Sequence, residues 1–331
     1  MSELETAAER RSLIHTLRSL PAIYYSIAAL VVVVVAFSIG NPAFIGLFNI
    51  NIILLSAVIL LAVGIGQCWA IVTGGIDLSV GGVISLVSVI FMLTVQPLGY
   101  WAYPLGLLIG AVVGYVNGIL LTKVRIPSFI ATLGTGGILV SVSYLFSPKA
   151  ISVPFKSINI LKVVNGYFLD LGDIKLSNAF IIGVLFFAMF YFIQRFTTIG
   201  RNIFYVGSNV GMSWLSGVNI DRTKNMAFMF TGIGAAAAGL ILASRQLSGF
   251  PTIGAPYVLS SIATVVLGGT AMTGGAGGVV NTLIGAILLA VIQNGMTVVG
   301  VDVYMQQSLL GAMIILCVWI SFDRSKVEIV K

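Results

Sequence analysis

The sequence predicts an all-α, polytopic integral membrane protein with about ten transmembrane helices. Apolar residues make up 58% of its 331 residues, charged residues make up 8%, and the mean hydropathy is +1.09. This composition is typical of a protein that crosses a membrane several times. Long stretches without charge give sharper evidence, because a spanning helix needs about 20 mostly apolar residues and tolerates buried charge poorly.

Charge-free stretches divide the chain into its predicted spans. Residues 19–76, 78–122 and 246–301 can each hold two helices, since they run for 58, 45 and 56 positions without a charge. Four further stretches can hold one helix each, at 126–148, 176–194, 225–244 and 303–322. They predict ten spans in one transmembrane domain, 19–322, and an even number places both termini on the same side.

Basic residues predict which side is the cytoplasm, because short cytoplasmic loops carry an excess of Lys and Arg. With the N-terminus inside, the inner segments hold 12 of the 17 basic residues: Arg10, Arg11, Arg18, Lys123, Arg125, Arg195, Arg201, Arg222, Lys224, Arg324, Lys326 and Lys331. The outer segments hold Lys149, Lys156, Lys162, Lys175 and Arg245. We expect cytoplasmic tails at 1–18 and 323–331 and an outer segment at 147–176. The net charge of +7 then reflects topology, and nucleic acid is not an expected partner.

The sequence contains no convincing metal site or catalytic centre. His15 is the only histidine, and it lacks a second histidine or a cluster of carboxylates to complete a metal site. Cys68 and Cys317 lie within predicted spans, where we expect small apolar core residues. One histidine and scattered acids cannot supply the converging groups of an active site. We therefore expect no metal, no other cofactor and no enzymatic activity of this chain.

A first glycine-rich motif interrupts the apolar sequence after the second predicted span. It reads TGGIDLSVGG at 73–82 and includes Gly74, Gly75, Asp77, Ser79 and Gly81. A broken helix at membrane depth persists only where protein or a water-filled cavity satisfies its backbone. Asp77 has two interpretations, an N-cap of the next helix or a carboxylate that contacts a substrate or forms part of a gate.

A second motif, LGGTAMTGGAGG at 267–278, has a similar pattern and includes Gly268, Gly269, Gly274 and Gly275. Corresponding breaks in two halves of a chain point to a transport site near the midplane of the membrane. Gln293 and Asn294 follow in the next predicted span, and Gln306 and Gln307 lie in the span after it. Neutral amides suit a hydroxyl-rich solute better than an ion, and hydrogen bonding between helices is the alternative.

Residues 195–224 form the one sizeable segment in which basic residues cluster around an apolar helix. Asn209 is a good N-cap and Gly217 a good helix stop, so we expect about two turns from Asn209 to Ser216. Large apolar residues such as Trp214 would be poorly placed in water. The pattern predicts either a docking surface for a partner protein or a helix that lies among lipid headgroups.

Three motifs, GGIDLSVGG at 74–82, GRNIFYVGSNVGMSWLSGVNIDRTK at 200–224 and LGGTAMTGGAGGVVNTLIGA at 267–286, occur together, and the last continues through QNGMTVVGVDVYMQQSLLGAMIIL at 293–316. They resemble the permease subunits of ribose-type bacterial ABC sugar importers over nearly the whole chain. The resemblance implies an inner-membrane pathway for a monosaccharide or related polyol. It also implies three protein partners: an ABC ATPase subunit, a substrate-binding protein and a second permease subunit.

In such permeases a cytoplasmic loop docks a coupling helix into the ATPase. The resemblance therefore assigns eight residues of the coupling loop, 195–224, to ATPase coupling: Gly200, Arg201, Gly207, Asn209, Trp214, Leu215, Ser216 and Gly217. One departure concerns this surface. Family loops usually read Gly-Asn-Glu followed by alanines, whereas Gly207 is followed here by Ser208, Asn209, Val210 and Gly211, without the acid.

ATP hydrolysis is expected to take place on another chain. No glycine in this sequence is followed by lysine, so the phosphate-binding GxxxxGK[ST] loop is absent. The alternative function is a secondary transporter or channel for a neutral polar solute. Ion coupling usually leaves acids or histidines inside the membrane, and only Asp77 and Asp302 come near that position.

Overall fold

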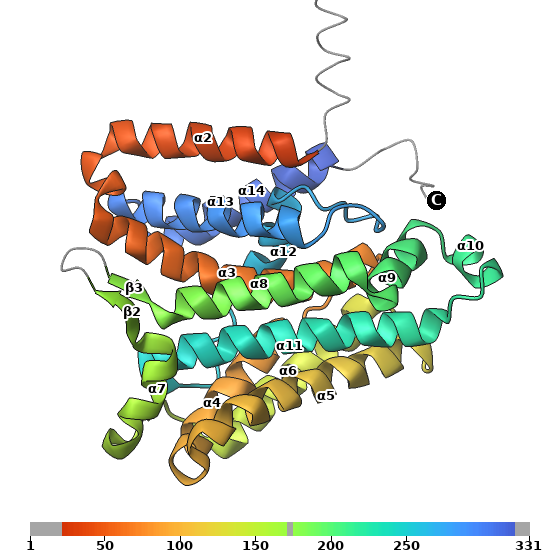
Figure 1. Cartoon of the computed structure of the whole chain (residues 1–331), viewed down its shortest axis with the longest axis horizontal. Coiled ribbons are helices and arrows are strands. Elements are labelled where there is room, and N and C mark those ends of the chain that lie inside the picture. The colour runs from red at the N-terminus through yellow and green to blue at the C-terminus, as the bar shows by residue number, and fades with distance from the viewer. Residues whose placement is uncertain (1–21, 171–174, 322–331) are drawn as a thin grey trace, which may run out of the picture.

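The computed structural model describes residues 22–170 and 175–321, and these form a bundle of long helices that run roughly side by side (Figure 1). The bundle contains α2 (Ala22–Gly40), α3 (Leu47–Val72), α4 (Val80–Leu98), α5 (Ala102–Thr122), α6 (Ser128–Phe146), α8 (Asn178–Phe196), α11 (Ile220–Gln246), the shorter α12 (Tyr257–Leu267), α13 (Val279–Val298) and α14 (Val303–Ser321). The predicted tails at 1–18 and 323–331, with His15, lie outside the described residues.

The predicted all-α membrane class is confirmed, and the count of ten spans stays a prediction. Seven described stretches are long and apolar enough to cross a membrane. One of them, Val80–Thr122, has 43 residues and contains both α4 and α5. The 3-10 turn η2 (Gly99–Trp101) separates these two helices. α12 has 11 residues, too few to cross a bilayer alone.

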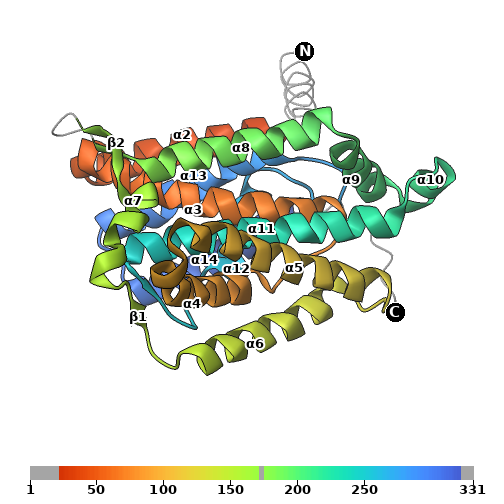
Figure 2. The same ribbon diagram turned by 60° about the horizontal axis from the view of Figure 1, so that its bottom comes forward.

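Short elements lie at the two ends of the bundle, and of these the sequence predicted only α10 (Figures 1 and 2). One end carries η1 (Pro42–Ile45), η3 (Phe155–Ser157), α7 (Ile158–Asn165) and two small antiparallel sheets, β1 (Ile151–Ser152) with β4 (Ser248–Gly249) and β2 (Tyr167–Asp170) with β3 (Lys175–Ser177). The opposite end carries α9 (Thr198–Ser208) and α10 (Val210–Leu215). The outer segment predicted at 147–176 coincides with the α7 end.

Basic residues separate between these two ends as the predicted topology requires. Lys123 lies beside Asp221 at the base of α11, next to α10. Arg245 lies at the other end of α11, where the Asn165 side chain of α7 donates to the carbonyl oxygen of Ser244. The two groups of basic residues thus mark opposite ends of the bundle. Which end faces the cytoplasm stays a prediction.

Helix α11 lies at the centre of the bundle and contacts α3, α4 and α5 through small residues. A Cβ at Gly66 of α3 would lie 2.8 Å from the Thr231 carbonyl oxygen, and the Thr231 hydroxyl donates to the Gly66 carbonyl at 3.0 Å. On α5, glycines recur every fourth residue along the buried face toward α11: Gly106, Gly110, Gly114 and Gly118. Close backbone approach of this kind favours association of helices in lipid, where no hydrophobic force draws them together.

We expect Gly234→Leu to disrupt the packing of α11 on α3. A Cβ at position 234 would lie 2.6 Å from both the Ala62 carbonyl oxygen and the Gly66 Cα, and such overpacking costs about 3 kcal/mol. Gly134→Leu is the matched control, because position 134 on α6 opens onto free space. Thermal melting of the purified variants should show a large fall for Gly234→Leu alone. Equal melting temperatures for the two would contradict this packing.

Candidate functional site

The first glycine-rich motif folds back into the bundle between α3 and α4. Gly74 has a positive φ of 78°, a conformation that glycine adopts without steric cost. The side-chain amide of Gln67 on α3 then pairs with the backbone N–H and C=O of Asp77, at 3.2 and 3.1 Å. Leu78 N–H donates to the Thr132 hydroxyl of α6 at 2.9 Å. Side chains of two neighbouring helices thus satisfy the backbone of this break, as a broken helix at membrane depth requires.

Asp77 contacts protein groups rather than open space. Its carboxylate accepts hydrogen bonds from the Ser79 N–H at 2.8 Å and from the Ser79 hydroxyl at 2.6 Å. Asn117 of α5 donates to the same hydroxyl at 2.8 Å. Both Asp77 and Ser79 are 1% exposed. Asp77 is not itself the N-cap of α4, because that position is Ser79, which makes no side-chain cap bond. The Asp77 carboxylate instead orders the residue at which α4 begins.

Asp77→Ala is therefore expected to lower the free energy of unfolding by about 1–3 kcal/mol, because two buried donors lose their acceptor. Asp77→Asn should cost less, since its side-chain oxygen can still accept one of these bonds. Thermal melting and solute uptake should be measured on both variants. Full stability combined with lost uptake in Asp77→Asn would instead assign the carboxylate charge to the transport pathway.

The second glycine-rich motif is an extended turn between α12 and α13. Gly269, Gly274 and Gly275 all have positive φ, of 87°, 89° and 75°. The turn is held by side chains: Gly278 N–H donates to the Thr270 hydroxyl at 3.2 Å, and Val279 N–H donates to the Gln194 side-chain oxygen of α8 at 2.8 Å. The start of α13 is thus fixed to the last turns of α8.

The two motifs meet each other and the end of α9. Gly275 N–H donates to the Val72 carbonyl oxygen at 2.9 Å, and the Ser208 hydroxyl lies 3.5 Å from the Gly275 carbonyl oxygen. A Cβ at Gly274 would lie 2.9 Å from the Gly207 carbonyl oxygen and 3.1 Å from the Gly74 nitrogen. We call this contact the glycine junction, formed by Val72, Gly74, Gly207, Ser208, Gly274 and Gly275.

The other predicted motif glycines lie apart from the glycine junction. A Cβ at Gly269 would lie 2.8 Å from the Ala22 Cβ, at the start of α2. Asn281 of α13 donates to the Gly268 carbonyl oxygen at 3.0 Å. Gly81 approaches the Gly254 carbonyl oxygen, and a Cβ at Gly75 would lie 3.1 Å from the Phe228 ring. These glycines permit close packing of the breaks onto separate segments of the chain.

Helix α10 occupies the predicted position, with Asn209 as N-cap and a positive φ of 79° at Gly217. The Asn209 side-chain oxygen accepts from Met212 N–H at 3.0 Å. Trp214 and Leu215 are 69% and 73% exposed, so α10 presents an exposed apolar surface.

Helix α9 was not predicted by the sequence analysis. Thr197 caps it through the Gly200 N–H at 3.1 Å, and it buries Ile203 and Val206, while Arg201 and Ser216 are exposed.

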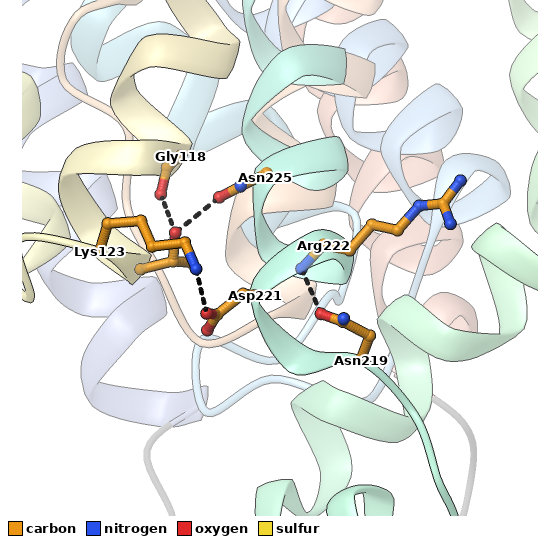
Figure 3. A network of polar contacts seen from close by, with 7 residues as sticks. Gly118, Lys123, Asn219, Asp221, Arg222 and Asn225 are labelled. Atoms are coloured by element: carbon orange, nitrogen blue, oxygen red, sulfur yellow. Dashed lines mark hydrogen bonds and ion pairs between the residues drawn. The ribbon is translucent and has the colours of Figure 1, made fainter.

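A polar network joins the chain after α10 to the end of α5 (Figure 3). Asn219 caps α11 by accepting from Arg222 N–H at 2.9 Å. The Asn225 side-chain amide donates to the Thr122 hydroxyl at 2.9 Å, and this hydroxyl donates to the Gly118 carbonyl oxygen at 2.9 Å. Lys123 and Asp221 form an ion pair at 3.5 Å. This pair is exposed and contributes little energy. The network positions the segment that leaves α10 against the bundle.

Gln293 and Asn294 line a cavity of about 500 Å³ at the α7 end, far from α10. The Asn294 side-chain oxygen accepts from Asn49 at 2.8 Å, which is the helix-to-helix role. Sequence reasoning missed Gln246 and Tyr257, which also line this cavity. They precede and follow the loop between α11 and α12, and no local motif marks them. The predicted pathway residues thus fall into two groups, one at the breaks and one at this cavity.

Comparison with known proteins gives consistent matches. A family model described as the permease component of branched-chain amino acid transport systems matches residues 49–318. The ribose import permease of Bacillus subtilis (strain 168) is 35% identical over 302 residues, which cover 90% of this chain and 91% of the relative. The ribose import permease of Escherichia coli (strain K12) is 33% identical over 296 residues, covering 88% and 91%.

A galactose/methyl galactoside import permease of Haemophilus influenzae is 31% identical over 313 residues, covering 90% of this chain and 92% of the relative. No solved structure matches the chain.

Proposed function

The chain belongs to the family described as the permease component of branched-chain amino acid transport systems, and from this membership we propose that it forms the membrane pathway of an ATP-driven sugar importer. Its relatives are named as permeases for ribose and for galactose or methyl galactoside, so the proposed cargo is a monosaccharide or related polyol. A substrate-binding protein delivers the sugar, and a separate ATPase subunit hydrolyses ATP. The family and these relatives give no such support to the alternative function, a secondary transporter or channel.

The glycine junction is the observation that best supports a coupled transporter. It places the end of α9, which leads directly into the exposed helix α10, against both glycine-rich breaks. A movement of α10 driven by the ATPase would therefore reach the end of α3 and the two glycine-rich breaks that precede α4 and α13. The absence of a phosphate-binding loop from the sequence agrees with ATP hydrolysis on another chain.

We further propose two permease subunits over two ATPase subunits in each transporter. The resemblance to permeases of ABC importers implies such a pair, in which each permease chain supplies half of the pathway. Co-expression of the permease with its ATPase, followed by mass measurement of the intact detergent-solubilised complex, tests this stoichiometry. Two permease copies are expected, and a complex with one copy would refute the proposal.

The proposed topology places α10 in the cytoplasm and α7 outside. A membrane-impermeant thiol reagent should label Asn159→Cys in intact cells and Ser216→Cys only after permeabilisation, since both positions are exposed at opposite ends of the bundle. The background carries alanine at positions 68 and 317. The reverse labelling pattern would rule out both the topology and docking of α10 on a cytoplasmic ATPase.

A further inference from the structure

The cavity at the α7 end has a second, inner chamber. The outer chamber is about 500 Å³ and the inner one about 270 Å³, and Ser56, Gln246, Tyr257 and Gln293 line both. Residues of α3, α11, α12 and α13 line the pair, and α14 adds to the wall of the outer chamber. Both chambers are partly open, and one subunit supplies all of these walls. The outer chamber has the volume of a small-molecule site, about 300–1,000 Å³.

The walls of the chambers are polar but nearly uncharged. Five side-chain amides line them: Gln246, Gln293, Asn294, Gln306 and Gln307. Arg245 is the one charged residue among the described lining residues, and it lies on the inner chamber. An amide offers both a donor and an acceptor, so it can bind a hydroxyl group in either role. Amide oxygens also occur in Ca²⁺ sites, but there they accompany carboxylates, and no described lining residue has a carboxylate.

Helix packing accounts for only part of this amide cluster. Asn294 accepts from Asn49, and Gln306 donates to the Thr297 hydroxyl and the Val301 carbonyl oxygen, at 3.3 and 3.0 Å. Within the part of the chain that the structure describes, no side-chain hydrogen bond to protein involves Gln246, Gln293 or Gln307. Gln246 and Gln307 are exposed at the mouth of the outer chamber and Gln293 is half-buried, so all three amides are free to bind a solute. Phe250 and Tyr257 add ring surface to the same walls.

We infer that this two-chambered cavity binds a neutral polyhydroxy solute inside one subunit, held by Gln246, Gln293 and Gln307 with Arg245 at its inner end. Two amides can bridge neighbouring hydroxyls, the aromatic rings can cover the apolar face of a sugar ring, and Arg245 can donate to a hydroxyl at depth. The inference rests on the proposed function and adds to it a sugar site in the permease itself, separate from the binding protein.

Protection of a cysteine within the cavity tests the site. Ser56→Cys is nearly isosteric and lines both chambers. Val299→Cys is the matched control, because Val299 is exposed near the same end but lines neither chamber. The full-length permease, with alanine at positions 68 and 317, is placed in lipid nanodiscs without ATPase or binding protein. It is then labelled with a small polar thiol reagent, with or without D-ribose or D-galactose.

The sugar that the assembled transporter imports should slow labelling at position 56 about tenfold when present at about ten times its dissociation constant, and should leave position 299 unchanged. Adding Gln293→Leu should raise the half-protecting concentration about tenfold, equivalent to about 1.4 kcal/mol. Gln96→Leu, on the exposed face of α4 and outside both chambers, should not change it.

Two results would overturn the site. An imported sugar that gives no protection at position 56 refutes it and leaves the proposed function intact. If position 56 stays unlabelled without sugar while position 299 reacts, the cavity is closed to polar molecules. That result also refutes the proposed sugar site. The proposed function itself fails separately, if the assembled transporter takes up no monosaccharide with ATP.

Discussion

The purified ATPase subunit is expected to bind the Trp214→Ala permease at least about thirtyfold more weakly than the wild type. Trp214 is 69% exposed on α10, and central interface anchors of this kind commonly contribute about 2 kcal/mol or more, where about 1.4 kcal/mol corresponds to tenfold. Leu215→Ala should have a similar effect. Because both side chains project from a short helix at the end of the bundle, the variants should still insert and fold.

Trp101→Ala is the matched control for this experiment. Trp101 is 75% exposed in η2, at the end of α4 that leads into α5 and away from α10, so its loss should leave ATPase binding unchanged. The reconstituted variants are titrated with ATPase subunit, and uptake is measured in parallel. Wild-type affinity in Trp214→Ala, together with altered lipid association, would assign α10 to the lipid headgroups instead.

Gly275→Leu is expected to abolish ATP-driven uptake while leaving the ATPase bound. Gly275 has a φ of 75°, and a Cβ there would lie 2.7 Å from the Ser208 Cα, so a side chain would force α9 away from both breaks. Binding-protein-stimulated ATP hydrolysis should be lost as well. ATPase binding should remain near wild type, because the surface of α10 is unchanged.

Gly300→Leu is the control that distinguishes the steric clash at position 275 from the strain of placing a side chain on a left-handed backbone. Gly300 has a similar φ of 86° with nothing near its Cβ position, so this variant carries only the cost of a left-handed backbone, about 1–2 kcal/mol. It should be inserted and active. Membrane levels of both variants are measured by immunoblot. Normal uptake in Gly275→Leu would show that the glycine junction does not transmit coupling.

Local sequence signals predicted α10 well and α9 not at all. Asn209 caps the start of α10 and Gly217 ends it through backbone groups only a few residues away, so both ends can be identified from the sequence. The spacing of Ile203 and Val206 indicates a buried face only once α3 and α11 lie beside α9. The strands were missed for a similar reason, since two-residue strands such as β1 exist only through a partner far away in the chain.

The contacts that define the candidate site depend on tertiary structure. The two glycine-rich breaks are recognisable by composition, but the contact of Gly275 with Val72 and Ser208 joins three distant segments. The cavity likewise assembles Gln246, Gln293 and Gln307 from three helices or their ends. The adjacent amide pairs Gln293–Asn294 and Gln306–Gln307 were identified from the sequence, because adjacent amides within an apolar span are conspicuous. Gln246 follows Arg245 at a helix end, where polar residues are ordinary.

ATP-dependent uptake into proteoliposomes is the most direct test of the proposed importer. The permease is reconstituted with its ATPase, with ATP on the ATPase side and binding protein loaded with radiolabelled D-ribose or D-galactose on the other. We expect accumulation of sugar that requires ATP and the binding protein and that fails with Trp214→Ala. Accumulation driven by an ion gradient, without ATP or the ATPase, would contradict the account.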